Sequence, residues 1–138
     1  MAKRVKNQLR CDVLLFDYWV RNGDRNLSEM GGNVNLLVSS EGNALQVIDF
    51  NLAFDKDFTV EDLHHHVFWP SQSKALPDLV DRVSYENRFR STLSNFDRIV
   101  STLPQEWLEK LPEPLDYIQY LRETLDRFAR PKFWEELL

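Results

Sequence analysis

Apolar residues recur at helical spacing in the first part of this chain and again in its second half. A stripe at spacings of three and four residues predicts a helix from residue 3 to about residue 21. The pair Asn22-Gly23 is a strong helix breaker and ends this helix. Everything after residue 58 is again typical of helices. The spacing therefore predicts a mainly α protein, with other structure confined to the residues between these two parts.

Two short β-strands are expected between the helical parts. Residues 34–38 and 45–48 have the composition of strands, and "EGN" at 41–43 is typical of a turn. We therefore predict a small antiparallel β-hairpin, preceded by the polar loop "NGDRNLSEMGGN". Because the chain has 138 residues, we expect one domain over residues 1–138.

Charge and composition exclude several classes of protein. The net charge of −5 argues against a nucleic-acid partner, which would require a basic surface. No apolar stretch is long enough for a membrane span or a signal peptide, so we expect a cytoplasmic protein without a membrane partner. Cys11 is the single cysteine, so the chain offers neither an internal disulfide nor a thiolate metal site.

Acidic and amide side chains gather at the base of the predicted hairpin. The start of one antiparallel strand lies beside the end of the other, so Asn33 and Asp49 should be neighbours, with Asp24 close above them. Carboxylate and amide oxygens suit Mg²⁺, and a further acid can act on a hydroxyl proton, as phosphoryl transfer requires. The alternative is an ordinary turn, because Asn, Asp and Gly are common turn residues. Residue types alone favour the turn, whereas the order of the elements favours the metal site.

The segments "FDYWVRNGDRN", "GNVNLL" and "LQVIDFNLAF" together resemble the catalytic core of the HipA-like kinases. These kinases are distant relatives of protein kinases and phosphoinositide kinases. The later segments "HHHVFW" and "RPKFWEELL" are also similar to this family, so the resemblance covers nearly the whole chain. It implies a kinase C-lobe of HipA type, which agrees with a mainly α fold that contains one hairpin.

The resemblance also implies roles for single residues. Asp24 would be the catalytic-loop acid that accepts or orients the substrate hydroxyl, and Asp49 would chelate the Mg²⁺ that bridges the ATP phosphates. Kinase loops place the metal-binding Asn five residues after the catalytic Asp, where this chain has Glu29. If "LSEM" is an insertion, the metal-binding residue is Asn33, with Asn35 as the alternative.

Three further features have both a structural and a functional interpretation. Under the resemblance Arg25 belongs with the cofactor-binding residues, where it would meet a phosphate or brace Asp24. Asp17 lies in an apolar helix, where an unpaired charge is costly, so we expect it to accept hydrogen bonds from the loop backbone or to pair with Arg21 or Arg25. The run "HHH" at 64–66 has no assigned catalytic role, because consecutive helical residues point in different directions.

A complete kinase also needs a Gly-rich loop over the phosphates and a Lys on a strand of its N-lobe. The four glycines, at positions 23, 31, 32 and 42, form no GxGxxG pattern, and the residues before Gly23 are predicted to be helical. We therefore expect a C-lobe without its N-lobe. The implied cofactors are Mg²⁺ and ATP, bound weakly at most.

Three interpretations of the function remain open. In the first, the chain is the catalytic half of a serine/threonine kinase, completed by a protein partner or by a homodimer. In the second, it is a non-catalytic binding or regulatory module of pseudokinase type. In the third, it is a small complete phosphotransferase with an unusual ATP site. The first predicts an exposed apolar patch beside the hairpin and the loop after Asp24.

Overall fold

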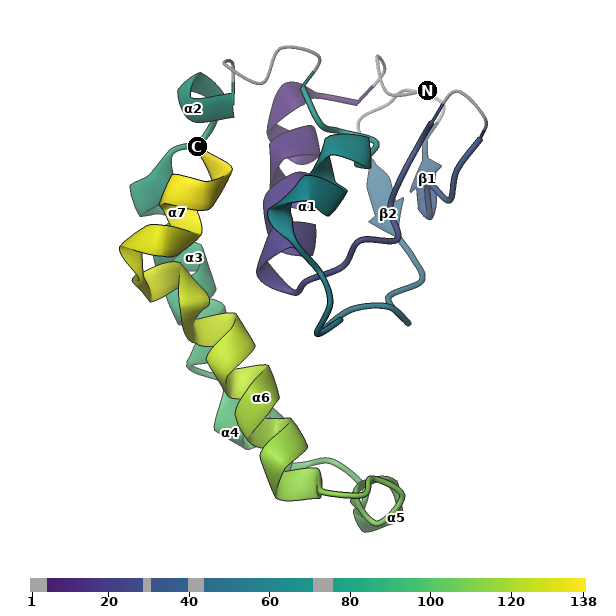
Figure 1. Ribbon diagram of the computed structural model, residues 1–138, viewed down its shortest axis with the longest axis vertical. Coiled ribbons are helices and arrows are strands. Elements are labelled where there is room, and N and C mark those ends of the chain that lie inside the picture. The colour runs from purple at the N-terminus through teal and green to yellow at the C-terminus, as the bar shows by residue number, and fades with distance from the viewer. Residues whose placement is uncertain (1–4, 29–30, 40–43, 71–75) are drawn as a thin grey trace. The chain divides into compact units, whose positions relative to one another are not determined.

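A computed structural model describes residues 5–28, 31–39, 44–70 and 76–138 of the chain (Figure 1). The described part is mostly helical and contains one two-stranded antiparallel sheet, which confirms the predicted fold class. It forms two compact units, Met1–Val80 with Leu137–Leu138 and Asp81–Glu136. Compact units of this kind can belong to one domain, so the single domain over residues 1–138 stays a prediction.

Helix α1 (Asn7–Trp19) is the central element of the first unit. Its sequence contains neither Gly nor Pro, and it buries one apolar face, with Leu14 and Leu15 only 1% and 0% exposed. Burial of such a side chain is worth about 1.5–3 kcal/mol. The helix ends two residues before the predicted position because Arg21 adopts a left-handed backbone conformation, with φ 55°.

The predicted hairpin is confirmed as β1 (Leu36–Val38) and β2 (Leu45–Val47), paired antiparallel with Leu36 opposite Val47. Both strands are shorter than predicted. Asn35 and Asp49, which flank them at the base of the hairpin, have φ values of 49° and 57° and so leave the extended conformation. The predicted turn at 41–43 lies outside the described residues.

A small apolar cluster joins the hairpin to the rest of the first unit. Its buried members are Val5, Val13, Leu36 and Phe68, which come from the start of the chain, α1, β1 and the segment after η2. The 3₁₀ helix η2 (Val60–His65) begins with a capping box, in which the backbone N–H of Thr59 donates to the Asp62 carboxylate (2.7 Å). Helix α2 (Leu76–Leu79) follows in the same unit.

The regular secondary structure of the second unit is all helical within its described residues. It contains α3 (Arg82–Leu93), α4 (Phe96–Ser101), α5 (Gln105–Leu108), α6 (Pro114–Asp126), η4 (Arg127–Ala129) and most of α7 (Pro131–Leu137). Aromatic rings form its core, with the ring of Phe89 at 5.8 Å from Phe128 and 6.5 Å from Phe133. Helices α3 and α6 pack against each other (Figure 1). None of the helices described is long and apolar enough to cross a membrane.

Candidate active site

The loop after α1 is held by backbone hydrogen bonds to the last residue of η2 and to the segment that follows it. The N–H of Leu27 donates to the carbonyl of His65 (2.9 Å), and the N–H of Val67 donates to the carbonyl of Arg25 (3.0 Å). Asn26 forms an isolated antiparallel bridge with His66. These contacts on both sides of Asn26 fix the backbone just after Asp24, although no regular strand is formed.

The same loop also closes on itself. The N–H of Asn26 donates to the carbonyl of Asn33 (3.1 Å), and the side-chain oxygen of Asn26 accepts from the N–H of Asn33 (3.3 Å). Gly32 allows this closure, because a Cβ there would lie 2.4 Å from the carbonyl oxygen of Asn26. The glycine therefore brings Asn33 back towards the start of the loop.

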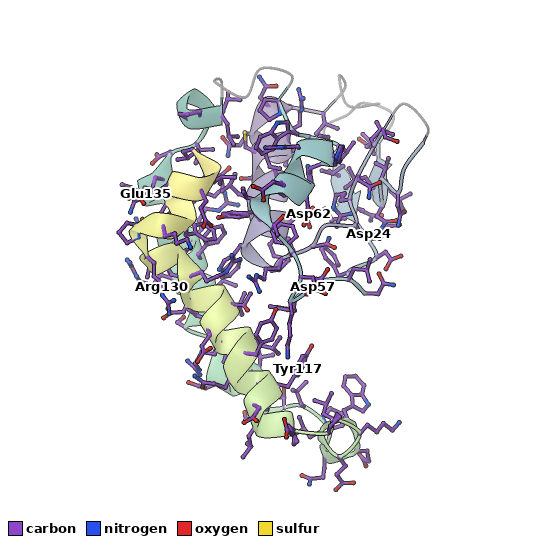
Figure 2. The ribbon with its side chains drawn as sticks, in the orientation of Figure 1. Asp24, Asp57, Asp62, Tyr117, Arg130 and Glu135 are labelled. Atoms are coloured by element: carbon purple, nitrogen blue, oxygen red, sulfur yellow. The ribbon has the colours of Figure 1, made fainter. Side chains whose placement is uncertain are left out.

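The loop closure brings Asp24, which is labelled in Figure 2, together with two asparagines. Oδ2 of Asp24 accepts hydrogen bonds from Nδ2 of Asn33 (2.7 Å) and from Nδ2 of Asn35 (3.0 Å). The side chain of Asn33 is exposed, whereas that of Asn35 is partly buried. Two donors thus orient one carboxylate at the entrance to β1. Each asparagine makes this contact through Nδ2, so its amide oxygen, Oδ1, is not used in it.

Asp49 lies at the base of the hairpin, on the side of β2. The N–H of Ile48 donates to the carbonyl of Asn35 (3.1 Å), so Asp49 is one residue beyond this paired position. Its exposed carboxylate accepts a hydrogen bond from the N–H of Asn51 (3.4 Å). The structure therefore joins Asp24, Asn33 and Asn35 directly, and it places Asp49 next to them in register. Continued past Leu36 and Val47, the register places Asp49 opposite Val34, between Asn33 and Asn35.

A buried ion pair lies beneath this cluster. Nε of Arg25 donates to Oδ2 of Asp17 (2.7 Å), and both side chains are 0% exposed. One of the expected partners of Asp17, Arg25, is therefore in contact with it. Oδ1 of Asp17 also accepts from Nδ2 of Asn22 (2.9 Å), and Oδ2 contacts Nε2 of His66 (3.0 Å). Hydrogen-bond donors thus surround this buried carboxylate, as a buried charge requires.

Arg25 also contacts the base of the hairpin. Its Nη1 donates to the carbonyls of Asn35 (2.7 Å), Ile48 (3.3 Å) and Val34 (3.4 Å). The guanidinium is used entirely inside the protein, so this placement argues against direct contact with a phosphate. The bracing interpretation is favoured instead, although Arg25 braces Asp17 and the hairpin and not Asp24.

The histidine run supports the loop structurally. Nδ1 of His66 accepts the N–H of Phe68 (3.0 Å), so Nε2 carries the proton that is donated to Asp17. His64 is exposed and packs against the ring of Trp69 at 4.8 Å. Over the described residues, no group of three or more His, Cys, Asp or Glu side chains is arranged to hold a metal ion. A cation site would therefore combine carboxylates with amide oxygens and non-protein ligands.

Two residues of this network were not predicted as supports of the site. Asn22 was interpreted only as part of a helix breaker, yet it is 1% exposed and bonds to Asp17. His66 lies 49 residues from Asp17 in sequence, and a local pattern cannot report such a contact. The one available signal was its position directly before the apolar run "VFW", which is typical of a residue entering the core.

Several apolar side chains on the loop, the hairpin and the segment after it are exposed. They are Leu27 (51%), Leu37 (55%), Ile48 (43%), Phe50 (40%) and Leu52 (51%). Phe16 on α1 is 38% exposed, and its ring meets that of Phe50 edge-on at 5.7 Å. We call these six residues the apolar rim. That these residues form the docking patch of the first interpretation stays a prediction.

Chemically, the cluster suits a hard cation better than a soft one. It offers carboxylate and amide oxygens, without thiolate or imidazole ligands, and this donor set fits Mg²⁺. Mg²⁺ commonly takes only one or two protein carboxylates and fills its remaining positions with water and phosphate oxygens. The exposed Asp49 carboxylate and the Asn35 amide oxygen could supply such a partial set of ligands.

Comparison with known proteins agrees with the resemblance in the sequence. A family model described as HipA-like kinase matches residues 1–137, which is nearly the entire chain. Searches of curated proteins and of solved structures found no match. The loop, the hairpin and the Asp24 cluster lie inside the matched region. Because the family model covers far more than half of the sequence, the chain belongs to the HipA-like kinase family.

Proposed function

We propose that this chain is the catalytic C-lobe of an ATP- and Mg²⁺-dependent kinase and that it requires a second lobe for phosphoryl transfer. The observation that carries the proposal is the pair of hydrogen bonds from Asn33 and Asn35 to Oδ2 of Asp24 (2.7 and 3.0 Å). Membership of a kinase family makes phosphoryl transfer the chemistry to which such a cluster is suited.

In this proposal Asp24 acts on the substrate. Its carboxylate, oriented by two amide donors, would accept a hydrogen bond from the substrate hydroxyl and take its proton as the bond to phosphorus forms. Phosphoryl transfer depends mainly on positioning, so the fixed backbone on both sides of Asn26 contributes by preventing the carboxylate from drifting.

Asp49 and one asparagine would bind Mg²⁺, which would neutralise charge on the ATP phosphates when bound. We assign the asparagine ligand to Asn35, because its carbonyl pairs with the N–H of Ile48, directly before Asp49. Asn33 lies on the other side of Val34, which the register places opposite Asp49, and its side chain donates the shorter of the two hydrogen bonds to Asp24 (2.7 Å). Asn33 remains the alternative ligand if the loop rearranges around a bound nucleotide.

The second lobe would dock on the apolar rim. Several apolar side chains of one unit, each 38–55% exposed, are typical of an interaction surface. A second lobe would bury them, supply the remaining contacts to ATP and exclude water from the cluster. It could come from another segment of the same protein, from a partner chain or from a second copy.

The test is calorimetric titration of the purified chain with Mg²⁺-ATP. Asp49→Asn should abolish binding, since it removes a charged ligand, whereas Asp24→Asn should leave binding within a few-fold of wild type. The matched control is Asp57→Asn, which removes another exposed carboxylate of the first unit outside the cluster (Figure 2).

Each outcome of the titration is informative. Binding that is lost only in Asp49→Asn supports the proposed ligand. Equal binding by wild type and Asp49→Asn would refute the assignment of Asp49. No binding by the wild-type chain would refute a nucleotide site in the isolated lobe and would favour the non-catalytic binding module.

A further inference from the structure

We propose that Arg25 is a positioning residue that preforms the cation site by fixing the backbone at Asn35 and Asp49 simultaneously. This inference rests on the proposed function, since it concerns the same two ligands. It assigns Arg25 a role different from contact with a cofactor. Arg25 would touch neither the cation nor the nucleotide and would act only through the residues that do.

One nitrogen atom contacts both sides of the hairpin base. Nη1 of Arg25 lies 2.7 Å from the carbonyl oxygen of Asn35, which enters β1, and 3.3 Å from that of Ile48, which leaves β2. The carbonyl of Ile48 belongs to the peptide group whose nitrogen is that of Asp49. Orienting this peptide group therefore orients the backbone of Asp49 as well.

Both proposed ligands have unusual backbone conformations. Asn35 has φ 49° and Asp49 has φ 57°, in the left-handed region that L-residues adopt rarely. Such conformations persist where the surrounding structure determines them, and they occur often at functional sites. The carbonyl of Asn35 accepts from both Arg25 and the N–H of Ile48 (3.1 Å), so this left-handed residue is held from two directions.

Arg25 is itself held on its other side. Its Nε and Nη2 donate to the two carboxylate oxygens of Asp17, at 2.7 and 3.4 Å. The ring of Phe50 lies over the guanidinium, with its centroid 5.2 Å from Cζ. The planar guanidinium can bond Asp17 through one edge and the carbonyls through another. A lysine ammonium has one donor centre and cannot span both groups in this way.

A purely structural role for Arg25 makes a different prediction from a positioning role. If Arg25 only stabilised the core, its replacement would lower the stability but leave the site unchanged in those molecules that remain folded. If Arg25 positions the ligands, its replacement changes the backbone of Asn35 and Asp49 and weakens cation binding even in fully folded protein. The two roles are therefore separated by measurements on the folded chain.

The experiment compares the full chain with its Arg25→Lys variant, using Mn²⁺ as a paramagnetic probe in place of Mg²⁺. Mn²⁺ affinity is measured by water proton relaxation, and three-bond HN–Hα couplings of Asn35 and Asp49 are measured by NMR without metal. We expect Arg25→Lys to weaken Mn²⁺ binding about 10- to 100-fold, the usual effect of losing a group that orients metal ligands. We also expect both couplings to move away from their left-handed values.

Two further variants complete the design. Leu14→Ala removes buried volume from α1 without changing a polar contact, and it should lower stability but leave Mn²⁺ affinity and both couplings as in wild type. Asp17→Asn is shape-conserving and loosens the same guanidinium. It should shift the same two couplings, and it provides the test if Arg25→Lys does not fold.

The possible results separate this inference from the proposed function. Wild-type couplings and affinity in Arg25→Lys and in Asp17→Asn would overturn the positioning role while leaving the cation site intact. A wild-type chain that binds no Mn²⁺ would refute the proposed cation site. In that case the couplings alone decide whether Arg25 fixes the backbone of Asn35 and Asp49.

Discussion

Arg25→Met should be strongly destabilising, because it leaves a buried carboxylate without its charged partner. Asp17 is 0% exposed and would lose hydrogen bonds of 2.7 and 3.4 Å. Removing one partner of a buried ion pair costs about 3–5 kcal/mol. Native proteins have a free energy of unfolding of about 5–15 kcal/mol, so this single change would remove a large fraction of that free energy.

The double variant Asp17→Asn/Arg25→Met tests whether the two charges are coupled. It removes both charges, and the single amide oxygen at position 17 can still accept a hydrogen bond from Asn22 or from His66, which bond to different oxygens of Asp17. The double variant should therefore lower the free energy of unfolding by about 0.5–3 kcal/mol less than the sum of the two single changes. The control is Arg82→Met, whose side chain is 48% exposed in its pair with Glu86 and should contribute less than about 1 kcal/mol.

Urea unfolding, followed by tryptophan fluorescence, measures these changes, with Trp19 buried in the first unit at 3% exposure. Because the chain has two compact units, unfolding need not be two-state, so hydrogen exchange at the Val67 amide supplies a local measure. That amide donates to the carbonyl of Arg25 (3.0 Å). Two results would refute a coupled, desolvated pair. One is a loss of less than about 1 kcal/mol in the free energy of unfolding of Arg25→Met, and the other is strict additivity in the double variant.

Two other predictions concern the loop and the thiol. Gly32→Ala places a Cβ 2.4 Å from a backbone oxygen and should lower the stability by about 1–3 kcal/mol in thermal unfolding. Gly23→Ala should lower it less, because a Cβ there meets the Phe58 ring at 3.4 Å and the Cβ of Asp62 at 3.7 Å, which are ordinary contacts. Equal losses would contradict this account of the loop. Burial, and secondarily the Asp12 carboxylate, raises the pKa of Cys11, so folded protein should resist iodoacetamide near pH 8.5 and react once unfolded in urea. Rapid labelling of the folded protein would show that Cys11 is accessible. Because the folded thiol holds its proton to higher pH than the unfolded thiol, the free energy of unfolding should fall as the pH rises from the ordinary thiol pKa through the raised pKa.

The elements of the first unit were predictable because they depend on local spacing, but their ends were not. The stripe that predicts α1 continues to residue 21, and the helix stops at Trp19 because Arg21 has φ 55°. The strands shorten in the same way at Asn35 and Asp49. Each of these residues has a left-handed backbone conformation, which the residue type permits for Asn and Asp but does not require. The tertiary contacts of the loop decide where it occurs.

The proximity of Asp24 to the asparagines follows from the topology of a hairpin. Asn33 and Asn35 are two residues apart, and the closure of the loop at Gly32 brings both side chains to Asp24. Residue spacing therefore could not choose between them as the metal ligand. Register does not choose either, because it places Asp49 opposite Val34, between the two asparagines. The hydrogen bond from the N–H of Ile48 to the carbonyl of Asn35 (3.1 Å) favours Asn35, and the sequence does not show this contact.

The ion pair of Asp17 and Arg25 connects the stability of the first unit with the geometry of its site. A buried ion pair is on average no better for stability than apolar residues of the same volume, so stability alone does not explain its presence. An apolar pair could not donate to the carbonyls of Asn35 and Ile48 (2.7 and 3.3 Å), which Arg25 does from within the core. Asp17 then balances the charge that this donor brings. The pair is best explained as the means by which a small hairpin keeps its base in one conformation.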